Sequence, residues 1–154
     1  MNTTLLAELD ALPTLWEVQG RVPAPVAAVA ELLLAVGEGR VGGDNLLVLA
    51  RASAARQGAM TVVGAAGAYR AELAGQLEPI DIQVDRSKLA VQSWYAGVHT
   101  VSASAKGTEV IHRVHRVLPE HPGFARGIAE LGLRARMARD LAQVLGVITD
   151  RLGC

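Results

Sequence analysis

Cysteine and aromatic residues are scarce in this chain of 154 residues. Its one cysteine, Cys154, can neither form an internal disulfide nor build a cysteine-based metal site. Aromatic residues make up 3% of the chain, too few for a surface that stacks nucleic-acid bases, and the formal net charge of zero lacks the basic excess that phosphates attract. We therefore expect no nucleic-acid partner, no metal and no cofactor.

Long apolar runs and export signals are also missing. The first 13 residues contain no basic residue, and Glu8 and Asp10 interrupt their apolar stretch, which is unlike a signal peptide. The longest uncharged run, residues 89–105, contains glutamine, histidine, threonine and serine side chains and is too polar for a membrane span. We expect a cytoplasmic protein that does not insert stably into a membrane.

The hydrophobic pattern changes its period along the chain. Residues 14–22 alternate between apolar and polar side chains and predict a half-buried strand, which Pro23 ends. Residues 25–37 then repeat at helical spacing. Residues 44–57 fit either a helix or a strand, and we favour the helix because alanine and arginine dominate their second half.

An antiparallel meander and a long helix are predicted for the rest of the chain. Alternating segments bounded by turn residues predict strands at residues 60–63, 69–77, 80–84, 88–96, 98–105 and 108–118. Residues 123–152 have apolar side chains three and four apart and predict one helix of about 44 Å. We expect a wide apolar stripe of this helix to face the sheet. Its main line includes Ala135, Ala138, Ala142 and Leu145, and Met137, Leu141, Val144 and Ile148 widen it.

Together these elements predict one α+β domain over residues 1–154. We expect a curved antiparallel β-sheet wrapped around the long C-terminal α-helix, with one or two short helices after the first strand.

Three stretches resemble the helix-grip proteins of the SRPBCC superfamily, also called START-like. Residues 16–29, WEVQGRVPAPVAAV, are similar to the family's first strand, its x-A-P step and its first helix. Residues 107–110, GTEV, are similar to the G-T-x-V that opens the last strand, and residues 126–152 to the closing helix. One departure lies at residues 39–60, which lack the Trp-Pro pair common in the family. The resemblance implies a helix-grip fold with an apolar cavity between the sheet and the C-terminal helix, and ligands such as polyketides or lipids.

Four residues are candidates for contact with a ligand in this cavity. On the last predicted strand, His112 and Arg116 share the more apolar face, which we expect to point inward. Tyr69 and Tyr95 fall on the apolar faces of their strands and could offer a hydroxyl group. Plain core packing is the alternative for each of them.

The other histidines are expected to play no such role. His112 and His115 are three residues apart, which on a strand sends them to opposite faces and argues against a shared metal. We expect His99 at a strand edge and His121 in a loop, both in solvent. Trp94 is expected on the outer face of the sheet.

These observations lead to three hypotheses on function. The first is binding of a hydrophobic small molecule, polyketide- or lipid-like, that His112, Arg116 and the tyrosines orient. The second is catalysis by a polyketide cyclase, aromatase or dehydratase, with His112 as an acid or base. The third is a protein-interaction module with a closed core, and the hydrophobic fraction of 51% also leaves a homodimer open. The inward face carries few acids or bases, which favours binding over catalysis without deciding whether the protein is an enzyme.

Overall fold

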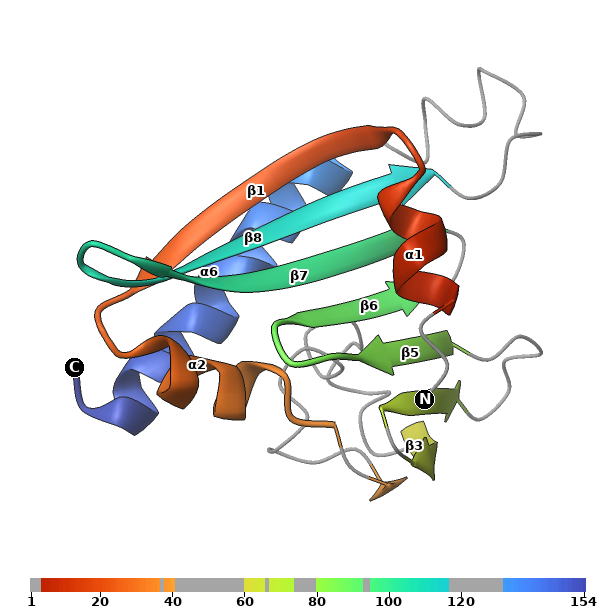
Figure 1. Ribbon diagram of the computed structural model, residues 1–154, viewed down its shortest axis with the longest axis horizontal. Coiled ribbons are helices and arrows are strands. Elements are labelled where there is room, and N and C mark those ends of the chain that lie inside the picture. Colours follow the sequence, from red (N-terminus) through yellow and green to blue (C-terminus); the bar gives the residue numbers. More distant parts are fainter. Residues whose placement is uncertain are drawn as a thin grey trace.

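The computed structural model describes residues 4–36, 38–40, 60–65, 67–73, 80–92, 95–116 and 132–154. Within these ranges, eight strands form one antiparallel sheet, and three helices pack on it (Figure 1). In the order of the sheet, the strands are β1 (Thr14–Val22), β8 (Gly107–Arg116), β7 (Tyr95–Ser104), β6 (Lys88–Gln92), β5 (Ile80–Val84), β4 (Ala68–Leu73), β3 (Met60–Ala65) and β2 (Gly39–Arg40). The helices are α1 (Thr4–Asp10), α2 (Val26–Leu33) and α6 (Leu133–Leu152).

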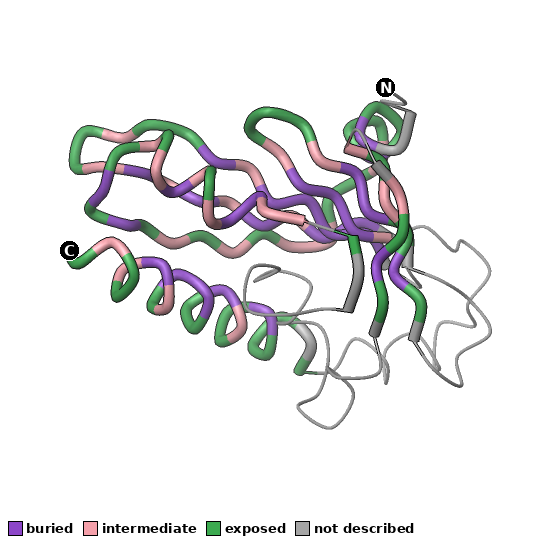
Figure 2. Tube along the Cα trace, turned by 90° about the horizontal axis from the view of Figure 1, so that it is seen from below, coloured by how far each residue is buried: buried purple, intermediate pink, exposed green. Residues whose placement is uncertain are grey.

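The helices cover opposite faces of the curved sheet. We call the face toward α2 and α6 the inner face, and the face toward α1 the outer face (Figures 1 and 2). On the inner side, buried residues of α2 and α6 form one core with those of the strands, and a Cβ added at Gly20 of β1 would contact Leu145 of α6. On the outer side, Leu6 and Leu9 of α1 pack in a second cluster with small side chains of β6 and β7. This is the α+β helix-grip arrangement that the sequence predicts.

The hairpin between β7 and β8 is joined to the segment that follows β1. Gly107 has a φ of +132°, a conformation that residues with a Cβ rarely adopt. The place that a Cβ would take at Gly107 lies against the backbone carbonyl oxygen of Val22. The next residue, Thr108, is fully buried and its hydroxyl donates a hydrogen bond to the carbonyl oxygen of Ala24 at 2.8 Å. Two of the stretches that carry the family resemblance, at Ala24 and at Gly107–Thr108, therefore meet in space.

The C-terminal helix is shorter than predicted and buries only part of the predicted apolar stripe. It begins at Leu133, after Gly132 with a φ of +75°, so its 20 residues span about 30 Å rather than 44 Å. Its buried residues are Met137, Leu141, Val144, Leu145 and Ile148. The alanines of the predicted main stripe are exposed, because burying the larger side chains removes more apolar surface from water. Among the described residues, no helix has the length and apolarity needed to cross a membrane.

Other boundaries differ in detail. The first strand spans Thr14–Val22, as predicted, but α1 before it was not expected, since a helix of 7 residues leaves only a weak pattern. Strand β6 ends at Gln92 and β7 begins at Tyr95, so the break predicted near residue 97 is wrong. Residues 44–57, with their alternative of helix or strand, lie outside the described part of the chain.

Candidate functional site

The inner face of the sheet can be followed through the pairing of its strands. Gly20 of β1 faces α6, and Val18, two residues earlier, shares that face. Val18 pairs with His112 of β8, which pairs with His99 of β7, which in turn pairs with Leu89 of β6. Directly paired residues point to the same side of a sheet, so both imidazole rings face the helix layer.

These two inward histidines are stacked. The centroids of their rings are 3.8 Å apart and the ring planes differ by 16°. His112 is 3% exposed and His99 is 5% exposed. The inward orientation predicted for His112 is thus found in the structure. The prediction that His99 lies in solvent is wrong, because the strand break comes earlier than expected and places His99 in the middle of β7, opposite His112.

A pocket of about 420 Å³ lies at the edge of the inner face, where the end of α2 approaches the turn ends of β4 and β5. Its walls are formed by Leu34, Val36, Gly67, Tyr69, Val84, Asp85 and Arg86. We call it the Tyr69 pocket. Tyr69 and Val84 also pack against the main core, so the pocket adjoins the core under the helices. The structure therefore places one predicted residue, Tyr69, in a pocket wall.

Two further predicted residues are placed only by their backbones. Tyr95 and Arg116 pair with each other at the ends of β7 and β8. Their side chains lie outside the described part of the structure, as do His121 and Trp94 entirely. Contact of Tyr95 and Arg116 with a ligand stays a prediction, and so do the positions expected for His121 and Trp94.

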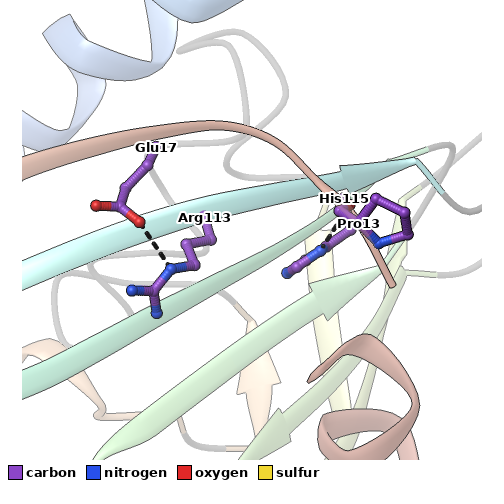
Figure 3. A network of polar contacts seen from close by, with 4 residues as sticks. All are labelled: Pro13, Glu17, Arg113 and His115. Carbon is purple, nitrogen blue, oxygen red and sulfur yellow. Dashed lines mark hydrogen bonds and ion pairs between the residues drawn. The ribbon is translucent and has the colours of Figure 1, made fainter. Parts of the chain in front are cut away.

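The outer face carries polar contacts that tie β8 to β1 and to the segment before it. His115 alternates with inward residues of β8 and lies on the outer face, on the opposite side from His112, as predicted. Its Nδ1 lies 3.2 Å from the carbonyl oxygen of Pro13, and Arg113 Nε donates to a Glu17 carboxylate oxygen at 2.7 Å (Figure 3). Among the described residues, no group of three or more His, Cys, Asp or Glu side chains has an arrangement that could hold a metal ion.

A larger pocket, of about 680 Å³, lies beside α1 and β3 to β6, mainly on the outer side. Its polar lining includes Glu8, Arg70, Asp81, Gln83 and Gln92. Arg70 Nε lies 3.3 Å from the carboxylate of Asp81, and Gln83 Oε1 accepts a hydrogen bond from the backbone nitrogen of Leu6 at 2.8 Å. Charged and amide groups therefore make up much of the lining of this pocket. An apolar molecule therefore fits the smaller Tyr69 pocket better than this larger one.

Solved structures share this fold at low sequence identity. Protein NE0264 from Nitrosomonas europaea has a TM-score of 0.53 and 11% identity, over 90% of this chain and 96% of that one. Protein CV1439 from Chromobacterium violaceum has a TM-score of 0.50 and 14% identity, over 89% and 99% of the two chains. TTHA0849 from Thermus thermophilus has a TM-score of 0.50 and 14% identity, over 88% and 94%. A scan against protein-family models and a search of curated proteins find no match. At these identities the likeness shows the fold alone.

Proposed function

We propose that the protein binds a hydrophobic small molecule, polyketide- or lipid-like, between the sheet and the C-terminal helix, with the Tyr69 pocket as one end of the binding site. The observation that carries the proposal is this pocket: its volume of about 420 Å³ is within the range of small-molecule sites. Leu34, Val36 and Val84 give it apolar walls, and Tyr69 adds a hydroxyl-bearing ring. The resemblance of residues 16–29 and 107–110 to SRPBCC proteins supports the same function.

The affinity would come mainly from apolar burial. Burial of about 300 Å² of apolar surface on binding contributes about 7.5 kcal/mol, before the cost of ordering the ligand is subtracted. Polar groups on the walls then set its orientation rather than its affinity.

Catalysis on the bound molecule, as in a cyclase or dehydratase, is the second candidate. The observation in its favour is the stacked pair of His99 and His112, because imidazole can exchange a proton near neutral pH. The two candidates differ in one respect: an enzyme converts the molecule, whereas a binding protein releases it unchanged.

The test uses the purified full chain. Native mass spectrometry beside organic-solvent extraction is expected to show an apolar molecule bound in stoichiometric amount, and the same spectra report the oligomeric state. The apolar fluorescent probe N-phenyl-1-naphthylamine is expected to displace that molecule and to bind in its place. Comparison of the extracted molecule before and after incubation with the protein separates binding from conversion.

Two matched variants locate the binding. Val84→Trp fills the Tyr69 pocket and is expected to weaken probe binding at least tenfold. Val63→Trp is the control, because Val63 is 44% exposed and lines the larger outer pocket instead. Circular dichroism checks that both variants are folded. Probe binding that Val63→Trp abolishes and Val84→Trp spares would reject the Tyr69 pocket. A protein that binds neither a native molecule nor the probe would favour the closed core of an interaction module.

A further inference from the structure

Strand β1 is an open edge of the sheet. It pairs with β8 on one side, and no described strand lies beyond it on the other (Figure 1). From Trp16 to Val22 its register with β8 is regular, and neither a proline nor an inward charge interrupts the strand. Natural edge strands are usually shortened, bulged or interrupted by proline or inward charges, which prevents pairing with another strand. An edge of this length without those protections is suited to pairing with a further strand.

The hairpin between β7 and β8 shows which backbone groups of β1 face this open edge. Ser104 and Gly107 flank a two-residue turn and pair with each other, so their backbone hydrogen bonds join β7 to β8. The direction of the backbone groups alternates along a strand, so those of Thr108 point to β1, where Thr108 pairs with Val22. Every second residue of β1 counted back from Val22 therefore bonds to β8, and the backbone groups of the residues between them point to the open edge. Those residues are Glu17, Gln19 and Arg21.

The side chains of these three residues are complementary to those of a second copy of β1. All three are exposed and lie on the outer face. When two copies of β1 pair antiparallel about a two-fold axis at Gln19, Glu17 lies opposite the partner's Arg21, and Arg21 lies opposite the partner's Glu17. A two-fold axis at Glu17 or at Arg21 would instead place two like charges opposite each other. The charges of the edge therefore favour one register.

The ion pairs within each copy extend the same pattern. Arg113 Nε donates to Glu17 at 2.7 Å, and Arg21 lies 3.8 Å from Glu109. In the two-fold arrangement, one row of alternating charge crosses both strands of each copy: Arg113, Glu17, the partner's Arg21 and the partner's Glu109. The side chain of Arg21 is 68% exposed, so it can contact the partner's Glu17. On the inner face, the same register places no charged side chain at the junction.

We propose that β1 is the interface of a homodimer, in which two copies pair edge to edge about Gln19 and their sheets continue into one. The inference is independent of the proposed function, since the Tyr69 pocket lies several strands away from β1. Paired residues exchange backbone hydrogen bonds across the axis, and each Glu17 forms an ion pair with the partner's Arg21. One strand per copy buries less surface than a standard protein interface, so we expect a dissociation constant of about 50 µM.

The experiment reverses charges at the interface and measures dissociation constants by sedimentation equilibrium. Glu17→Arg and Arg21→Glu are each expected to weaken dimerisation about tenfold, because each places like charges opposite one another across the axis. An equal mixture of the two variants is expected to dimerise again, because the unlike charges then face each other. Arg70→Glu is the control: it reverses a charge in an exposed ion pair on β4 and should change the dissociation constant less than about twofold. Circular dichroism checks that all variants are folded.

Hydrogen exchange of the wild type is a second readout. The backbone N–H groups of Glu17, Gln19 and Arg21 are expected to exchange more slowly when the protein concentration rises from about 5 µM to about 500 µM, and that of Val18 is not. A wild type that stays monomeric at the higher concentration overturns the inference and leaves the edge to a strand of another protein. A dimer that neither variant weakens, or a mixture that fails to dimerise, also overturns it. The binding of N-phenyl-1-naphthylamine is a separate measurement, so the proposed function stands or fails independently.

Discussion

Thr108→Val removes one buried hydrogen bond while it keeps the shape of the side chain. The Thr108 hydroxyl donates to the carbonyl oxygen of Ala24 at 2.8 Å, and Ala24 itself is only 8% exposed. Valine leaves this carbonyl without its donor. Leaving one partner of a buried hydrogen bond unsatisfied costs about 1–3 kcal/mol. For a chain of this length, we expect Tm to fall by about 2–12 °C.

Thr149→Val is the matched control for this substitution. The Thr149 hydroxyl also donates at 2.8 Å, but its acceptor is the carbonyl of Leu145 one turn earlier in α6. Such a local bond competes with the helix rather than joining distant segments, so its loss should cost less than about 0.5 kcal/mol. Urea unfolding followed by circular dichroism gives both free energies, provided that the m-value is unchanged. Equal costs in the two variants would refute the view that Thr108 links β8 to the segment after β1.

Four further substitutions test a turn, the packing of α6 and a surface ion pair. Gly107→Ala should cost more than about 1 kcal/mol in thermal unfolding, because the φ of +132° is strained for any residue with a Cβ. Leu141→Ala, at a position 3% exposed, should cost about 2–5 kcal/mol in urea unfolding, whereas Ala138→Ser on the exposed side of α6 should cost less than about 0.5 kcal/mol. Arg113→Ala should cost less than about 1 kcal/mol, since Arg113 and Glu17 are 43% and 42% exposed, and unfolding in high salt should remove most of that difference.

The alternation of apolar and polar residues, together with turn residues, was enough to predict most of the sheet, because this pattern lies within the sequence of each strand. The first strand, Thr14–Val22, has one face toward a core and one toward solvent, and its pattern is unambiguous. The C-terminal helix was harder to predict, because alanine is compatible with both its faces. The predicted stripe was too wide: Met137 and Leu141, which belong to it, are buried against the sheet, whereas Ala138 is exposed.

The candidate site could be predicted only in part, because the surroundings of a side chain also depend on contacts between strands. His112 sits in a long, regular strand, so alternation was sufficient to place it on the inner face. His99 follows a break between two strands, and a shift of a few residues in that break changes its surroundings from solvent to core. Trp16 shared a predicted apolar face, but only the three-dimensional structure reveals that its N–H lacks a partner among the described residues. Satisfaction of a buried donor depends on contacts between strands, which the pattern along one strand does not contain.

The two ends of the inner face constrain the shape of the ligand. In the sheet order, Tyr69 on β4 is three strand spacings from His99 on β7 and five from Trp16 on β1, which is about 14 Å and about 24 Å along the sheet. A two-ring molecule cannot contact both ends, so a ligand that contacts both of them is elongated. The equilibrium affinity depends on the contacts of the bound state and not on the route of entry. Val84→Trp, which fills the Tyr69 pocket, should therefore weaken binding of every ligand that contacts this pocket, as measured by titration with N-phenyl-1-naphthylamine, and an unchanged affinity would place the binding site elsewhere.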